Sequence, residues 1–283
     1  MTKSAYDVQV LLPIHNEGES IEATIREIYA ELSRHCRVQF ILCEDGSKDN
    51  TKEVLRRVAQ EIPAKLLLSD ARKGYSRAVR DGMLETDADY LLCLDSDGQC
   101  EPKDFKKFWD ARLKADVLIG WRVNRADNWM RKAMSRTFFH VWRALYKCPI
   151  NDPSCPYMLA PREVILDLAG RMGAMEQGYW WEFMARVSRL GYSILEFPVA
   201  HRDRAAGETQ VYKLRKLPGI GYKHFKALFQ ILAETRSIPP RTAATLPTPA
   251  ADLQSLMQGV GPADGEKYEV ESDGRRRVVE TRE

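Results

Sequence analysis

The sequence predicts an α/β fold in which a mostly parallel sheet is covered by helices on both faces. Short apolar runs alternate with amphipathic segments of helical length through residues 8–94, a pattern typical of strands joined by crossover helices. Polar, glycine-containing motifs follow three of these apolar runs, as expected where parallel strands end at one edge of a sheet. A chain of 283 residues, 44% of them hydrophobic, can bury one sizeable core or two small ones.

The elements of the first half follow from this alternation. In the first amphipathic segment, Ile21, Ile25 and Ile28 fall on one helical face. Asp49 can cap the next helix. We therefore expect strands at 8–13, 38–43, 64–68 and 90–94, and helices at 20–33, 51–61 and 73–85.

The second half is less regular and ends in an amphipathic helix and a polar tail. That helix carries lysines and arginines around aromatic and aliphatic residues, so it either packs on the domain or lies on a membrane surface. The tail is rich in Pro, Ala, Thr and charge, which is typical of disorder. We expect helices at 102–114, 128–146, 161–168, 179–190 and 218–235, and strands at 117–120 and 193–199. The expected units are 1–217 (a folded domain), 218–236 (the helix) and 237–283 (the tail).

Composition narrows the class of protein. The net charge of +3 gives no concentrated basic excess, so no nucleic-acid partner is expected. There is no apolar run of transmembrane length and no signal-peptide core at the N-terminus. We expect a cytoplasmic protein, with the inner face of a membrane as a further option. The six cysteines form no CxxC pair and are expected to be reduced, with a Cys148–Cys155 pair as the less favoured alternative.

Acidic side chains follow three of the predicted strands. Glu17 follows the first strand, Asp45 the second, and Asp95 and Asp97 the fourth. Because parallel strands present their carboxyl ends at one edge, these carboxylates are expected to gather there. Glu17 and Asp45 also suit the turns and helix starts in which they occur, and the two roles are compatible.

The segment Asp95-Ser96-Asp97 is a candidate metal site. Residues two apart at a strand end point the same way, so both carboxylates can face one site. Mg²⁺ and Mn²⁺ prefer oxygen ligands, and Gln99 can add one more. A metal held there could neutralise a leaving diphosphate. The alternative is a solvated turn, which Asp97-Gly98 also suits.

The ordered motifs LLPIHNEGESI, EDGSKDNT, LDSDGQ and GWR resemble those of family 2 glycosyltransferases with a Rossmann-like GT-A fold. The later motifs NWMRKAMS, DPSCPYML and RAAGETQ are similar to the branch of dolichol-phosphate mannose synthases and polyisoprenyl-phosphate glycosyltransferases. The resemblance covers about residues 7–232. It implies that residues 1–217 are a glycosyltransferase domain that inverts the anomeric carbon and takes a GDP- or UDP-sugar.

The resemblance also implies roles for individual residues. Pro13 and Glu17 would line the nucleotide pocket, and Asp45 would contact the base or ribose. Asp95, with Asp97 and Gln99, would hold Mg²⁺ or Mn²⁺ beside the nucleotide-sugar. Phosphate groups of the donor or of a lipid acceptor would be bound by Arg122, Arg131, Ser135 and Arg204, since arginine binds phosphate with a planar fork.

The catalytic groups that the reaction requires depend on the chemical class of the acceptor. A hydroxyl acceptor needs a general base, for which Glu182 is the candidate, although Glu182 also suits a structural position beside two tryptophans. A phosphate acceptor is already anionic and needs positioning and charge balance instead. The arginines favour a polyprenyl-phosphate acceptor at a membrane surface. Asp97, Arg122 and Glu182 are therefore the candidate catalytic residues.

Three departures from the family pattern bear on the acceptor. Cys155-Pro156-Tyr157 stands where Gly-Phe is frequent, and Thr209-Gln210 stands where Ser-Lys is frequent. Many relatives also carry transmembrane helices after the catalytic domain. Two alternatives stay open: transfer to a soluble or protein hydroxyl with Glu182 as base, and a non-catalytic nucleotide-sugar-binding or membrane-peripheral scaffold.

Overall fold

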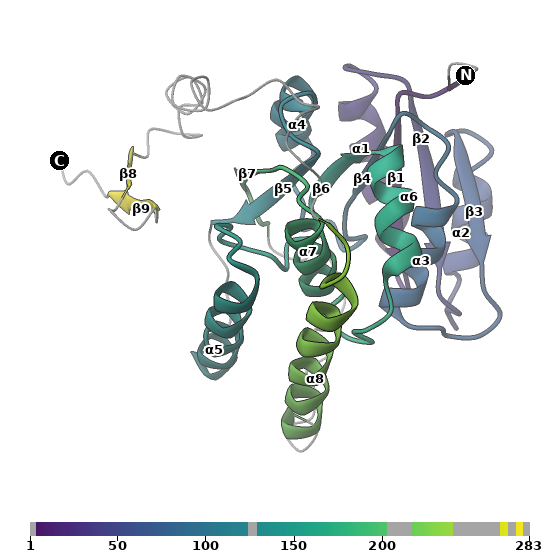
Figure 1. The fold of residues 1–283 in the computed structure, drawn as a ribbon. Helices are drawn as coiled ribbons and strands as arrows, with labels where there is room; N and C mark the ends of the chain where they lie inside the picture. The colour runs from purple at the N-terminus through teal and green to yellow at the C-terminus, as the bar shows by residue number, and fades with distance from the viewer. Residues whose placement is uncertain (1–3, 124–128, 203–216, 240–266, 271–275, 280–283) are drawn as a thin grey trace.

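A seven-stranded sheet forms the centre of the molecule (Figure 1). The computed structural model describes residues 4–123, 129–202, 217–239, 267–270 and 276–279. The strand order is β3-β2-β1-β4-β6-β5-β7. The strands are β1 (Val8–Ile14), β2 (Val38–Glu44), β3 (Ala64–Leu68), β4 (Tyr90–Cys93), β5 (Val117–Arg122), β6 (Met158–Pro161) and β7 (Ile194–Val199).

Six of these strands confirm the predicted ones, and β6 was not predicted. β6 runs antiparallel to both of its neighbours, β4 and β5. The other pairs, β1–β2, β1–β4, β2–β3 and β5–β7, are parallel. The sheet is therefore mixed but mostly parallel. Four residues that end in proline carry too little periodic signal to stand out as a strand.

Helices cover both faces of the sheet. α1 (Ile21–Leu32) and α2 (Thr51–Val58) lie behind it in Figure 1. α3 (Tyr75–Leu84) and α6 (Arg162–Arg171) lie in front of it. The change of face follows from handedness, because the chain passes from β1 to β3 in one direction and returns across β1 to reach β4. The segment predicted as a helix at 102–114 contains a 3₁₀ turn, η1 (Pro102–Asp104), followed by α4 (Phe105–Ala111).

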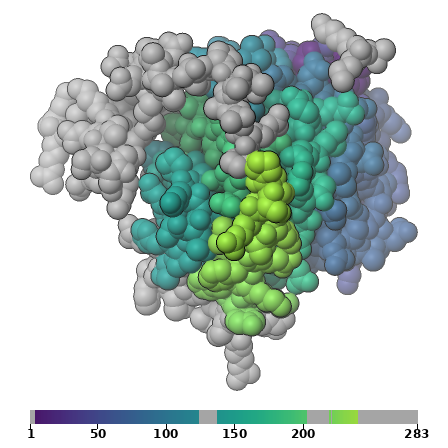
Figure 2. Space-filling model, in the orientation of Figure 1, coloured from purple at the N-terminus to yellow at the C-terminus, as the bar shows by residue number. Residues whose placement is uncertain are grey.

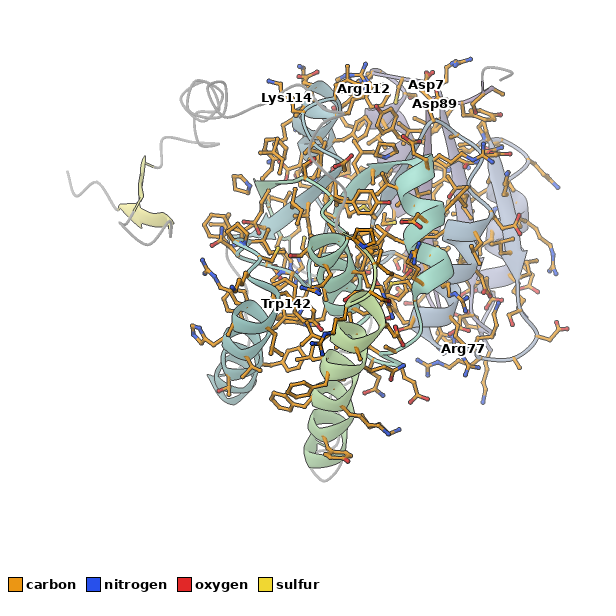
Figure 3. The ribbon with its side chains drawn as sticks, in the orientation of Figure 1. Asp7, Arg77, Asp89, Arg112, Lys114 and Trp142 are labelled. Carbon is orange, nitrogen blue, oxygen red and sulfur yellow. The ribbon has the colours of Figure 1, made fainter. Side chains whose placement is uncertain are left out.

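The second half of the chain contributes three further helices. They are α5 (Trp129–Tyr146), α7 (Tyr179–Arg189) and α8 (Leu217–Thr235). Trp142 of α5, labelled in Figure 3, is fully buried and donates its indole N–H to the Trp181 carbonyl of α7, 3.0 Å away. α8 packs against α7, and the Tyr146 hydroxyl donates to the Leu228 carbonyl at 2.7 Å. The last predicted helix therefore packs on the domain, and it lies at the surface seen in Figure 2.

The two ends of the sheet differ. Asp7 and Asp89 directly precede β1 and β4 and so mark the amino ends of these strands. Arg77, in the first turn of α3, lies at the opposite end in Figure 3. α5 and α8 extend past the sheet on the same side as Arg77 (Figure 1). These helices therefore extend in the direction in which the carboxyl ends of β1, β2 and β4 point.

The remaining expectations concern the tail, the cysteines and the membrane. Within the predicted tail, β8 (Lys267–Val270) pairs antiparallel with β9 (Arg276–Val279), and the disorder expected of residues 237–283 stays a prediction. All six cysteines are free, as expected, and Cys148 and Cys155 form no disulfide. In the part of the chain that the structure describes, no helix is both long and apolar enough to span a bilayer.

Candidate active site

The loops after β1 and β2 are joined by backbone and side-chain hydrogen bonds. The Asn16 N–H donates to the Ser47 hydroxyl at 2.9 Å, and the Lys48 N–H donates to Asn16 Oδ1 at 2.9 Å. Asn16 has a φ of 55°, a left-handed conformation that asparagine tolerates better than most residues. The predicted gathering of these two loops at the carboxyl edge is confirmed.

Pro13 and Glu17, the predicted nucleotide-pocket residues, both lie at the end of the first strand. Pro13 is buried within β1. The Glu17 N–H donates to Thr51 Oγ1 at 3.0 Å, and Glu17 Oε2 accepts from the Ser20 hydroxyl at 3.1 Å. Glu17 therefore shapes the start of α1, which is the structural one of the two roles predicted for it. Its contact with a nucleotide, like that of Pro13, stays a prediction.

Asp45 fixes the loop between β3 and α3. It is 3% exposed, and its carboxylate accepts the Lys73 N–H at 2.5 Å and the Gly74 N–H at 2.9 Å. Gly46 has a φ of +66°, and an added Cβ there would meet the backbone of Ala71 and Arg72. Asp45 thus holds this loop against the end of β2. The contact of Asp45 with a base or ribose stays a prediction.

A pocket opens at the ends of β4, β5 and β7. Its polar lining includes Asp95, Asp97 and Gln99 after β4, Arg122 at the end of β5, and His201 after β7. An isolated antiparallel bridge joins Cys100 to His201. The structure therefore brings the predicted acidic motif and Arg122 around one space.

Gln99 is held by the segment that follows β7. Its side-chain amide donates to the Arg202 carbonyl at 3.1 Å, and the Arg202 N–H donates to the Gln99 carbonyl at 2.9 Å. Arg202 is itself anchored by Glu101 and Glu27, with its guanidinium 2.7 Å from Glu27 Oε1. These bonds hold the Gln99 amide nitrogen in place, which leaves the Gln99 side-chain oxygen as the atom that can serve as a ligand.

Arg122 is held rigidly at the pocket wall. Its Nε and one Nη donate to the two carboxylate oxygens of Asp152 at 2.7 and 3.0 Å, and it also donates to the Ser154 hydroxyl at 2.8 Å. Burial lowers the pKa of Arg122, but the Asp152 carboxylate outweighs this and raises it. The pocket wall therefore contains a fixed guanidinium that is always charged, with Asp152 as its counter-ion, and guanidinium groups suit phosphate.

His201 was missed by the sequence reasoning. It lines this pocket, and it follows a strand end as the acidic residues do. Its placement depends on the pairing of residues 201–202 with residues 99–100, which no local pattern encodes. A weak signal exists in the polar run His201-Arg202-Asp203-Arg204, which begins one residue beyond the last predicted strand.

The donor atoms of the pocket suit a metal that arrives with a substrate. Within the described ranges, no three His, Cys, Asp or Glu side chains meet closely enough to enclose an ion. Asp95 and Asp97 supply two carboxylates, which is the usual protein share of a Mg²⁺ site completed by substrate phosphates. The residues present therefore fit a cation shared with a diphosphate, rather than one caged by protein alone.

Glu182 lies in a structural position. It is 0% exposed. Oε1 accepts the N–H groups of Gly173 and Ala174, both at 3.0 Å, and Oε2 accepts that of Met175 at 2.7 Å. Arg186 pairs with the same carboxylate at 2.9 Å. A carboxylate so engaged is poorly placed to take a proton from an acceptor, and the structural interpretation of Glu182 is favoured.

The remaining predicted phosphate ligands lie outside the described side chains. They are Arg131 and Ser135 in the first turns of α5, and Arg204 beyond the end of β7. Their predicted contact with phosphate stays a prediction.

Comparison with known proteins places this geometry in a family. The family model of Glycosyl transferase family 2 matches residues 9–165, more than half of the chain. The undecaprenyl-phosphate 4-deoxy-4-formamido-L-arabinose transferase of Aeromonas hydrophila is 28% identical over 76% of this chain and 65% of its own length. The same-named protein of Edwardsiella ictaluri is 25% identical over 90% of this chain and 78% of its own length. Glycosyltransferase AglD of Haloferax volcanii is 26% identical over 83% of this chain, which spans 39% of that protein.

Solved structures share the fold. Glucosyl-3-phosphoglycerate synthase from Mycobacterium tuberculosis, in complex with Mn²⁺, UDP-glucose and phosphoglyceric acid, aligns with a TM-score of 0.57 and 18% identity over 86% of each chain. Mannosyl-3-phosphoglycerate synthase from Rubrobacter xylanophilus aligns with a TM-score of 0.53 and 14% identity, over 97% of this chain and 87% of its own. With more than half of its length matched by the family model, this chain belongs to glycosyl transferase family 2.

Proposed function

We propose that this protein transfers a sugar from a nucleoside diphosphate donor to a polyprenyl-phosphate-type acceptor, with inversion at the anomeric carbon. The observation that carries the proposal is the pocket in which Asp95, Asp97, Arg122 and His201 meet at the carboxyl edge of a family 2 domain. Negative and positive groups face one space there, as a site for a metal-bound diphosphate and a phosphate requires.

The donor side of the pocket is formed by the acidic residues. Asp95 and Asp97, with Gln99 beside them, would hold Mg²⁺ or Mn²⁺ against the donor diphosphate. The metal, when bound, would stabilise the negative charge that develops on the leaving group. A UDP-sugar is the first donor to test, because the Mycobacterium tuberculosis enzyme of this fold is described with UDP-glucose and Mn²⁺. A GDP-sugar is the second.

The residues on the acceptor side of the pocket favour a phosphate acceptor over a hydroxyl acceptor. Arg122 offers a fixed cation at the wall, whereas Glu182, the candidate base for a hydroxyl acceptor, is buried and engaged by three N–H groups and Arg186. In the proposed step, a phosphate oxygen of the acceptor bonds to the anomeric carbon and the bond from that carbon to the donor diphosphate breaks. The nucleoside diphosphate leaves, and no proton need be removed from the acceptor.

The names of the relatives support a lipid-linked acceptor. Two of them are called undecaprenyl-phosphate transferases. α8 retains an exposed aromatic and basic face after packing on the domain, with Tyr222 72% and Phe229 59% exposed, and with Lys223 and Lys226 also exposed. Such a face suits peripheral binding to the cytoplasmic surface of a membrane that contains the acceptor.

A transfer assay tests the proposal. The full chain is incubated with Mn²⁺, undecaprenyl phosphate in detergent micelles, and radiolabelled UDP-glucose or GDP-mannose, and the organic phase is counted. We expect label in the organic phase with one donor, lost on addition of EDTA. Parallel reactions contain a soluble phosphate acceptor or a hydroxyl acceptor instead.

Three outcomes would contradict the proposal. Label transferred only to a soluble phosphate would exclude the lipid acceptor. Label transferred only to a hydroxyl would support the alternative hypothesis of a hydroxyl acceptor. Binding of nucleotide without transfer or hydrolysis under any condition would favour the scaffold. A panel of other nucleotide-sugars is run before the scaffold is accepted, because the two donors named here do not exhaust the class.

A further inference from the structure

We infer that Tyr75 and Trp180 are positioning residues for Asp95, and that this hydrogen-bonded series sets the affinity of the pocket for a metal-bound nucleoside diphosphate. The inference rests on the proposed function and adds residues to it that the motifs did not single out. The three side chains come from three separate elements: α3, α7 and the end of β4.

The contacts form a directed series. The indole N–H of Trp180 donates to the Tyr75 hydroxyl oxygen at 2.8 Å. The Tyr75 hydroxyl donates to Asp95 Oδ1 at 2.9 Å. An indole nitrogen can only donate, so the Tyr75 oxygen must act as acceptor toward Trp180, and its own proton is left for the carboxylate. The direction of both hydrogen bonds is therefore fixed by chemistry.

Each end of the series is anchored in the core. Trp180 is 6% exposed and packs edge-on against Tyr179 and Phe183, with ring centroids 5.4 and 5.7 Å away. Asp95 directly follows the buried Leu94 at the end of β4. Tyr75 is 40% exposed, and its hydroxyl is held by the buried Trp180.

The start of α3 is also fixed from the nucleotide side. Tyr75 is the first residue of α3, and the preceding Gly74 has a φ of 95°. The Gly74 N–H donates to Asp45 Oδ2 at 2.9 Å. The start of α3 thus connects two predicted donor-binding carboxylates: Asp45 through the Gly74 N–H, and Asp95 through the Tyr75 hydroxyl.

The expected consequence is preorganisation. A hydroxyl that donates to an ionised carboxylate makes a charge-assisted hydrogen bond and restricts rotation of that carboxylate. With Oδ1 held by Tyr75, the direction of Oδ2 is limited before any ligand arrives. Removing the hydroxyl should therefore weaken metal-nucleotide binding, while the fold should remain, because Tyr75 lies outside the buried core.

The variants are Tyr75→Phe and Trp180→Phe, with controls at the far end of the sheet. Tyr90→Phe removes a hydroxyl from the first residue of the same strand, β4. Trp109→Phe removes an indole that packs against Tyr90, with ring centroids 5.7 Å apart. Calorimetry measures the Kd of UDP and GDP at saturating Mn²⁺, and the Mn²⁺ dependence of that Kd. Melting temperature without ligand is measured in parallel.

We expect Tyr75→Phe to weaken nucleotide binding by about tenfold, since hydrogen bonds to charged groups are among the stronger ones. The Mn²⁺ concentration needed for binding should rise, and the ligand-free melting temperature should stay near that of Tyr90→Phe. Trp180→Phe should weaken binding less than Tyr75→Phe does. The double variant should bind like Tyr75→Phe, because Trp180 acts on Asp95 only through the Tyr75 hydroxyl.

Two results would overturn the inference. One is a Tyr75→Phe protein that binds nucleotide and Mn²⁺ as the wild type does. The other is weakening that tracks a loss of melting temperature in both Tyr75→Phe and Trp180→Phe, which would show a structural role only. If the wild type itself binds no nucleotide with Mn²⁺, the proposed function fails instead, so the two failures are distinguishable.

Discussion

At the scale of single residues, Glu182 shows how a buried carboxylate can organise backbone. Three consecutive N–H groups, of Gly173, Ala174 and Met175, point at its two oxygens. Arg186 bridges it to Glu234 of α8, at 2.9 and 2.7 Å. One side chain therefore ties the loop before α7 to both α7 and α8.

Replacing Glu182 by Gln should lower the free energy of unfolding by roughly 3 kcal/mol, because Arg186 would stay buried with weaker compensation and the N–H groups would lose an anionic acceptor. Glu163→Gln, in the exposed first turn of α6, is the matched control and should change it by less than about 0.5 kcal/mol. Urea unfolding measures both. Equal stabilities, with a selective loss of turnover in Glu182→Gln, would return Glu182 to the role of base.

Glu196 gives the protein a specific dependence of stability on pH. Burial raises the pKa of Glu196 to about 7, against the opposing effect of hydrogen bonds from Asn151 and Asp152. In an unfolded chain a glutamate titrates near 4.3. Between about pH 4.3 and 7 the folded protein retains a proton that the unfolded chain releases, so stability falls as the pH rises through this window.

Glu196→Gln should remove this contribution. Glu196 faces the N–H groups of Asn151 and Asp152 and the Asn151 amide, and Asp152 in turn holds Arg122. We expect the free energy of unfolding of the wild type to fall more steeply than that of the variant between pH 5 and about 7.5. Parallel pH curves for the two proteins would show that Glu196 titrates normally.

At the scale of elements, the packing of α3 on the sheet depends on one glycine. A Cβ added to Gly82 would collide with Leu11 of β1 and Cys43 of β2. Gly170 in α6 is a natural contrast, because an added Cβ there meets nothing within 4 Å. The same substitution in two helices therefore isolates the effect of close packing.

Gly82→Ala should destabilise the protein by roughly 1–3 kcal/mol through overpacking. Gly170→Ala should stabilise it by about 0.5–1 kcal/mol, since alanine loses less backbone entropy in a helix. Chemical denaturation of both variants measures the difference. A destabilisation of similar size in both would mean that α3 does not approach the sheet as closely as the structure has it.

We expect the exposed face of α8 to contact the membrane. Replacing Tyr222 and Phe229 by Gln should reduce binding to vesicles of anionic lipid by about tenfold, because two exposed apolar rings are lost. Leu113→Gln removes an equally exposed apolar side chain, 66% accessible, beside Lys114 at the amino end of the sheet in Figure 3. Sedimentation with vesicles measures binding. Unchanged binding in the α8 variant would exclude this face as the contact.

At the scale of the whole molecule, the sheet and its helices were largely predictable. Strands buried on both faces are mostly apolar, as in β1, whose seven residues are all buried and all apolar except Gln9, and helices such as α1 repeat apolar residues at helical spacing. The position of Asp45, Asp95 and Asp97 after the carboxyl ends of their strands follows from the parallel topology. β6 was not predictable, because its four residues are placed by neighbours far away in the sequence.

Side-chain partners were harder to predict than positions. Arg122 was expected at the site, but its clamp by Asp152 depends on a loop 30 residues away. His201 and the Tyr75–Trp180 series also join segments that only the tertiary fold brings together, the latter across 105 residues. Sequence motifs therefore mark the residues that meet a ligand better than those that hold them in place.

The most direct test of a metal-dependent nucleotide-sugar site is a thermal-shift measurement with UDP and GDP, with and without Mn²⁺. It compares the wild type, Asp97→Asn, and the control Asp89→Asn, which changes an exposed aspartate before β4. We expect one nucleotide to raise the melting temperature of the wild type and of Asp89→Asn only with Mn²⁺, by mass action on the folded state, and to leave Asp97→Asn unchanged. An equal shift in Asp97→Asn, or no shift in any protein under any condition, would contradict such a site.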